Sequence, residues 1–130
     1  CVGNSADPLL LYVHGSGPLN SSMMWNHLEL DIERIAKERG GSNLPTRFFH
    51  VAIDCPGYGR SPGNRQIIRT HPGGLISSVI TALGRKSAAA LIGSSQGACA
   101  VFNCALEFPD CAHTLAVCHP VGHAPQRYDK

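Results

Sequence analysis

Residues 93–97 read G-S-S-Q-G, and this pattern constrains the fold of the 130-residue chain more than any other feature. It follows an apolar run at 88–92 and precedes a segment at 98–108 whose composition suits a helix. A strand, a sharp turn and a helix in this order would hold Ser95 in strained backbone geometry, where Gly93 and Gly97 relieve crowding. Such a turn places the serine hydroxyl near a helix start, which favours negative charge. The pentapeptide alone also fits an ordinary turn rich in glycine and serine.

A second turn near the start of the chain contains His14, Gly15, Ser16 and Gly17. It follows an apolar run that is typical of a buried parallel strand. If both turns meet at one sheet edge, the backbone N–H groups of Gln96 and Ser16 would form an oxyanion hole, with Gly17 as the alternative to Ser16. We interpret His14 as a histidine that braces the turn, and not as a catalytic group.

A third motif completes an ordered set. Residues 54–61 read D-C-P-G-Y-G-R-S after the apolar stretch 48–53, so a strand runs into a turn of the form D-x-P-G-x-G-x-S. The three motifs, in this order and spacing, resemble those of the α/β-hydrolase superfamily, and the similarity extends to about Pro120. The resemblance implies an α/β fold with a mostly parallel sheet and helices on both faces. It also implies that Asp54 braces its loop and is not the catalytic acid.

The resemblance further implies the chemistry of a serine hydrolase. Such an enzyme cleaves an ester, a thioester or an amide through an acyl-serine intermediate, here at Ser95. A histidine would take the hydroxyl proton, a carboxylate would orient that histidine, and the N–H groups of Gln96 and Ser16 would hold the oxyanion. The partner is then a small acyl substrate, and we expect no cofactor and no metal.

The residues that activate the serine are expected outside this sequence. In the family, the acid and the histidine come from strands that follow the region resembled here, so we interpret residues 1–130 as a single partial domain that lacks them. The protein is then an enzyme if its full-length chain supplies a histidine and a carboxylate. The alternative is a catalytically inactive subunit, a pseudoenzyme with a binding or structural role in a larger complex. A protein partner would then cover the exposed sheet edge.

Another source of the base lies near the end of the sequence. His119 and His123 follow the fourth apolar strand, and Asp129 comes after them. Ser95, His119 and Asp129 could form a compact triad, with His119 as base. We favour the reading of His119 and His123 as loop residues at the mouth of the site, because the family histidine comes from a later strand.

Composition excludes several other functions. The net charge is +2, with 15% charged residues and no Lys/Arg cluster, which argues against nucleic-acid binding. No run of about 18 apolar residues is present, so we expect no membrane span. The histidines show no metal-ligand spacing. The cysteines lie in apolar patterns without C-x-x-C spacing, and we interpret them as buried, reduced thiols of an intracellular, cytoplasmic protein. They are Cys1, Cys55, Cys99, Cys104, Cys111 and Cys118.

Hydrophobic periodicity predicts alternating strands and helices, a β-α-β-α-β-α-β core. Strands are expected at 8–14, 47–54, 88–92 and 111–118, and helices at 21–39, 75–83 and 98–108. Asn20 and Ser21 are candidate caps of the first helix, whose apolar stripe would face the sheet. This stripe contains Trp25, Leu28, Ile32 and Ile35. The loop 56–74 is rich in glycine, proline and arginine, and we expect it to line or cover the site.

Overall fold

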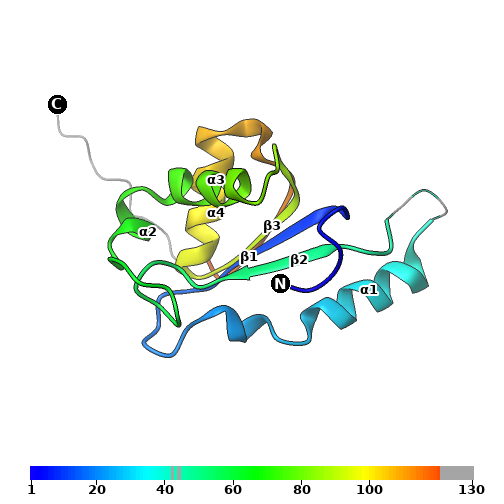
Figure 1. Ribbon diagram of the computed structural model, residues 1–130, viewed down its shortest axis with the longest axis horizontal. Coiled ribbons are helices and arrows are strands. Elements are labelled where there is room, and N and C mark those ends of the chain that lie inside the picture. Colours follow the sequence, from blue (N-terminus) through cyan, green and yellow to red (C-terminus); the bar gives the residue numbers. More distant parts are fainter. Residues whose placement is uncertain (42, 44, 121–130) are drawn as a thin grey trace.

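The computed structural model describes residues 1–41, 43 and 45–120, and its centre is a four-stranded sheet (Figure 1). The strands are β1 (Leu9–Val13), β2 (Phe49–Ile53), β3 (Ala88–Ser94) and β4 (Ala112–Cys118). They lie in the order β2-β1-β3-β4, and every neighbouring pair is parallel. The four predicted strands are therefore confirmed, with small differences at their ends.

Helical segments connect these strands and cover the sheet on both sides. They are the 3₁₀ helices η1 (Ser22–Trp25) and η2 (Pro109–Cys111) and the α-helices α1 (Leu28–Arg39), α2 (Ile67–Thr70), α3 (Pro72–Ala82) and α4 (Gln96–Glu107). Figure 1 shows α1 on one face of the sheet and α3 and α4 on the other. This arrangement confirms the predicted α/β fold, because parallel strands need crossover connections that place helices on the sheet faces. None of the helices in the described ranges has the length and apolar character that a bilayer crossing needs.

The central strand β1 is buried on both faces, which explains its continuous apolar sequence. Leu9, Leu11 and Val13 belong to the larger core cluster, which includes residues of α3 and α4. Leu10 and Tyr12 belong to a smaller cluster on the opposite face. Successive side chains of a strand point to opposite faces, so β1 contributes to both cores.

Strand register brings the carboxyl ends of the strands to one edge. Val13, the last residue of β1, pairs with Ile53 of β2 and with Gly93 of β3. At the end of β3, Ser94 pairs with Cys118 of β4. The three turns singled out in the sequence each begin where one of these strands ends. They therefore meet at the same edge of the sheet.

The predicted helix at 21–39 is wrong as a single element. It is divided into η1 and α1 by Asn26 and His27, and His27 has a left-handed backbone with φ of 72°. A left-handed residue cannot continue a right-handed helix, so the chain changes direction between the two segments. The predicted stripe packs against the sheet through Trp25, Leu28 and Ile32, whereas Ile35 is 43% exposed.

The predicted loop at 56–74 also contains helical structure. It includes α2, and α3 already begins at Pro72 instead of residue 75. Proline favours the first turn of a helix because the N–H that it lacks has no acceptor there. Gly73 lies inside α3 at its contact with α4, where an added Cβ would lie 2.7 Å from the Cδ atom of Glu107. Pro72 therefore starts this helix, and Gly73 lets it pack closely on α4. Neither residue ends a helix here.

All six cysteines lie in the described part of the chain, and no disulfide joins them. Cys55, Cys104 and Cys111 are buried, but Cys1 and Cys118 are exposed, so the prediction of buried thiols is wrong for these two. Cys118 is exposed because it ends the outermost described strand. Burial raises the pKa of the Cys55 thiol to about 12, with a smaller contribution from Asp54. Its thiol is therefore protonated at neutral pH and unreactive.

Candidate active site

Ser95 occupies the sharp turn between β3 and α4. Its backbone has φ of 54° and ψ of −118°, a conformation that a residue other than glycine adopts at a cost of about 1–3 kcal/mol. The Ser95 N–H donates to the Cys118 carbonyl oxygen at 2.9 Å, which extends the ladder between β3 and β4 by one residue. The sequence thus places a strained serine at the sheet edge where the strands end.

Two glycines make this turn sterically feasible. A Cβ added to Gly93 would lie 2.5 Å from the Gly97 carbonyl oxygen. A Cβ added to Gly97 would collide with the Val13 carbonyl oxygen and lie 2.6 Å from that of His14. The first turn of α4 therefore packs directly on the backbone at the end of β1, and both positions of the G-x-S-x-G pattern need glycine.

The start of α4 presents backbone N–H groups that have no hydrogen-bond acceptor among the described residues. The Cys99 N–H donates to the Ser95 carbonyl oxygen at 3.3 Å, so the N–H groups of the preceding helical residues have no acceptor within the helix. Gln96 is the first of these residues and is 7% exposed. A backbone N–H in the first turn of a helix can donate to an anion, and the oxyanion role of Gln96 stays a prediction.

The loop after β1 lies against the same turn. A Cβ added to Gly15 would lie 2.9 Å from the Cβ atom of Ser95. Ser16 follows directly and is exposed, and Gly17 is half-buried. The structure therefore brings the 14–17 turn beside the Ser95 turn, although about 80 residues separate them in the chain.

His14 connects the loops after β1 and β2. In one tautomer its Nδ1–H donates to the Gly15 carbonyl oxygen at 2.6 Å, and its Nε2 accepts from the Cys55 N–H at 2.9 Å. The ring is fully buried and contacts the Tyr58 ring edge-on, with 5.1 Å between centroids. Both nitrogens are engaged with the backbone, so His14 has no free nitrogen for proton transfer from Ser95.

Asp54 holds two segments together. Its Oδ1 accepts from the Ser22 N–H at 2.7 Å and its Oδ2 accepts from the Arg60 N–H at 2.8 Å. Desolvation is the largest influence on its pKa and raises it, but hydrogen bonds from Arg60 and Ser22 and the nearby His14 together leave the pKa below its usual value. The carboxylate accepts from backbone groups of the loops, and within the described part no hydrogen bond joins it to a histidine.

Sequence reasoning missed the position of Asn20. The cap of η1 is Ser21, whose hydroxyl accepts from the Met23 N–H at 3.3 Å. Asn20 instead turns its amide back over the glycines of the preceding loop. No local pattern indicates this, because the contact depends on how the loop folds against Ser95.

His119 follows β4 directly, is exposed and has φ of 47°. Among the described residues, no hydrogen bond joins the Ser95 hydroxyl to a histidine. His123 and Asp129, the other members of the predicted local triad, lie outside the described residues. Within the same residues, no group of three or more His, Cys, Asp and Glu side chains could hold a metal ion.

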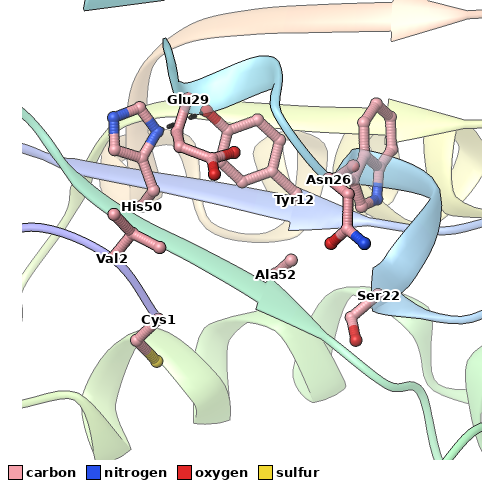
Figure 2. Close-up of a pocket in the computed structure, with 9 residues that line it drawn as sticks. Cys1, Val2, Tyr12, Ser22, Asn26, Glu29, His50 and Ala52 are labelled. Carbon is pink, nitrogen blue, oxygen red and sulfur yellow. Dashed lines mark hydrogen bonds between the residues drawn. The ribbon is translucent and has the colours of Figure 1, made fainter.

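A cavity of about 150 Å³ lies elsewhere, beside η1, α1 and β2. Figure 2 shows Tyr12 and His50 directed toward one another there; the hydroxyl and Nδ1 are 2.7 Å apart. Burial, and to a smaller extent Glu29, raises the pKa of Tyr12, which keeps its hydroxyl protonated. Ser95 does not line this cavity, so the cavity is separate from the turn described above.

Comparisons with solved structures agree with the fold described above. No protein-family model matches the sequence. Epoxide hydrolase A from Mycobacterium thermoresistibile is similar over 89% of this chain and 33% of its own, with 27% identity and a TM-score of 0.67. Naproxen esterase from Bacillus subtilis is similar over 87% of this chain and 35% of its own, with 26% identity and a TM-score of 0.62.

A third solved structure is 2-hydroxy-6-oxo-6-phenylhexa-2,4-dienoate hydrolase from Rhodococcus sp. strain RHA1. It shares 20% identity over 88% of this chain, with a TM-score of 0.66, and this likeness concerns the fold alone. The match covers 39% of the Rhodococcus chain. This chain therefore spans well under half the length of each of these three proteins.

Proposed function

We propose that this chain, which has the fold of the N-terminal part of the α/β-hydrolases, carries the nucleophile and the oxyanion hole of a serine hydrolase. The substrate class is a small ester, thioester or amide, cleaved through an acyl-serine intermediate at Ser95. The chain is similar in fold to esterases and epoxide hydrolases. Among the reactions of these enzymes we select acyl transfer, because the residue at the turn is a serine, which can form an acyl intermediate.

The observation that carries the proposal is the backbone of Ser95. Its positive φ is unfavourable for a residue with a side chain, and such strain persists where the surroundings enforce it. Here the enforcement comes from the ladder bond to Cys118 and from the packing of Gly97 on β1. The result is a hydroxyl at the sheet edge beside unpaired N–H groups, which is the arrangement that nucleophilic attack on a carbonyl requires.

The proposed reaction follows from these positions. The Ser95 Oγ forms a bond to the carbonyl carbon while its proton passes to a histidine, and the carbonyl π electrons move onto oxygen. Backbone N–H groups of Gln96 and Ser16 stabilise that oxyanion. Collapse of the intermediate breaks the bond to the leaving group, which takes the proton, and water then hydrolyses the acyl-serine. We assign the histidine and its carboxylate to residues outside the described part, with His119 as the alternative base.

The alternative function is a binding or structural subunit without turnover. It is favoured by β4, which pairs with β3 on one side and has no partner on its other side among the described residues. Most of its residues are exposed, including Val117. An open strand edge can pair with another protein, so a partner covering β4 belongs to this alternative.

Labelling of the full-length protein with a fluorophosphonate probe tests the proposal. We expect a covalent adduct on Ser95, and we expect Ser95→Ala to abolish labelling and to lower the hydrolysis of p-nitrophenyl esters by at least about a thousandfold. Ser94→Ala is the matched control because it removes a neighbouring hydroxyl. This variant should keep both the labelling by the probe and the hydrolysis of p-nitrophenyl esters. If a folded wild-type protein shows neither labelling nor hydrolysis, the structural alternative gains support. Labelling that survives in Ser95→Ala would assign the nucleophile to another residue.

A further inference from the structure

The segment after the 14–17 turn folds back toward Ser95. The Asn20 N–H donates to the Gly17 carbonyl oxygen at 3.1 Å, which closes a four-residue turn with Pro18 at its second position. Leu19, at the third position, is 95% exposed. The turn reverses the chain, so the Asn20 side chain lies over residues that precede it.

The Asn20 amide approaches the serine across two glycines. A Cβ added to Gly15 would lie 3.1 Å from the Nδ2 atom of Asn20 and 2.9 Å from the Cβ atom of Ser95. The amide and the nucleophile therefore border the same small space from two sides. A Cβ added to Gly17 would lie 3.1 Å from Asn20 Cγ and 3.2 Å from its Oδ1, so this amide packs flat on Gly17.

The Asn20 side-chain amide makes no hydrogen bond within the described part of the fold. Among the described residues, neither Nδ2 nor Oδ1 of Asn20 has a hydrogen-bond partner, although the side chain is half-buried. Neither atom is among the side-chain N and O atoms that are both buried and unpaired in the described part, so the amide keeps contact with solvent and a ligand can reach it. An oxygen of a ligand bound at Ser95 can therefore accept a hydrogen bond from this amide.

We propose that the Asn20 side chain is a further catalytic residue, which donates a hydrogen bond from Nδ2 to the substrate oxygen that becomes the oxyanion. This inference rests on the proposed serine-hydrolase function and adds a side-chain donor to the backbone donors of Gln96 and Ser16. The donor is held in place before the reaction by the Gly17–Asn20 turn, so it reorganises little as charge develops. Because the oxygen gains charge only during the reaction, the bond should act on kcat more than on KM.

Steady-state kinetics of the full-length protein with p-nitrophenyl acetate tests this role. We expect Asn20→Ala to lower kcat by about 100-fold while KM stays within about twofold, since one such donor contributes about 100–1,000-fold. Asn20→Asp should lower kcat further, because a carboxylate repels the oxyanion. Asn26→Ala is the matched control, since it removes an exposed asparagine amide six residues away, and it should leave kcat unchanged.

Binding of phenylboronic acid gives a second readout that does not depend on turnover. Boron forms a tetrahedral adduct with an active serine, so the affinity should fall in Asn20→Ala by a factor similar to that in kcat. If kcat and boronate affinity are unchanged in Asn20→Ala but lost in Ser95→Ala, the role of Asn20 is refuted and the hydrolase function stands. If wild type binds no boronate and Ser95→Ala retains the wild-type hydrolysis rate, the proposed function itself fails. A thermal unfolding midpoint that drops without a change in kcat would make Asn20 a structural residue only.

Discussion

Gly97 lies where the first turn of α4 meets the end of β1. An added side chain there would meet the carbonyl oxygens of Val13 and His14, which are backbone atoms of the central strand and of the loop beside Ser95. These atoms cannot move without disturbing the register of β1 against β3. A single methyl group at this position therefore affects both stability and the geometry of the proposed oxyanion hole.

Gly97→Ala is expected to lower the free energy of unfolding by about 1–3 kcal/mol, because overpacking forces a backbone shift. Urea denaturation of the full-length protein, followed by circular dichroism, measures this change. Gly74→Ala is the matched control: Gly74 lies in α3 and an added Cβ would meet nothing within 4 Å. There we expect a gain of about 0.4–1 kcal/mol. Equal effects of the two substitutions would contradict the packing argument.

The break between η1 and α1 shows how one backbone conformation divides a helical sequence. The charges of α1 suit a helix that starts at Leu28, since Glu29 and Asp31 lie in its first turn and Arg39 in its last. The apolar spacing, however, continues through the break, and therefore the sequence predicts a longer helix. The left-handed conformation of His27 ends that continuity, and hydrophobic periodicity contains no signal for it.

His27→Gly is expected to raise the free energy of unfolding by up to about 1 kcal/mol. Glycine removes the penalty of a left-handed residue, and the greater freedom of the unfolded glycine chain offsets part of the gain. Leu30→Gly is the comparison, because Leu30 is 66% exposed within α1, and it should destabilise by about 1 kcal/mol. Thermal and urea unfolding of both variants measure these changes in the free energy of unfolding. If both variants lose stability to a similar extent, the His27 side chain stabilises the break between η1 and α1.

The sheet is unevenly protected from solvent. Its central strand β1 has helices over both faces and a strand on each side. On the outer side of β2, Val2 forms an isolated antiparallel bridge with His50. At the opposite edge, β4 is largely exposed. Stability within the described part is therefore concentrated around β1, whereas β4 is the edge available to further strands or to a partner.

Leu11→Ala should lower the free energy of unfolding of the full-length protein by about 2–5 kcal/mol. Leu11 is fully buried in the centre of β1, so the substitution leaves a cavity between the sheet and the helices. Leu30→Ala removes the same atoms at an exposed position, and it should change stability by less than about 0.5 kcal/mol. Denaturant titration of both variants measures the difference. A small loss for Leu11→Ala would indicate that the core relaxes to fill the space.

Local sequence patterns specify the strands, their parallel arrangement and the turns that hold Ser95 and Gly15. These features depend on local properties, namely continuous apolar runs and glycines where the backbone is crowded, and such properties can be read from neighbouring residues. The proposed nucleophile came from the G-x-S-x-G pattern in its strand–turn–helix context, and the predicted bracing role of His14 came from its place in the turn after the first strand. The base is not identified: the sequence leaves it between a later strand and His119, and among the described residues no hydrogen bond joins a histidine to the Ser95 hydroxyl.

The groups that surround the serine could not be read from the sequence, because they come together only in the folded chain. The bond between His14 and the Cys55 N–H, and the approach of the Asn20 amide to the space beside Ser95, join segments that are 41 and 75 positions apart in the sequence. Hydrogen bonds and close packing between distant segments depend on strand order and register, not on local preference. For that reason Asn20, which looked like a helix cap, became a candidate for contact with the substrate.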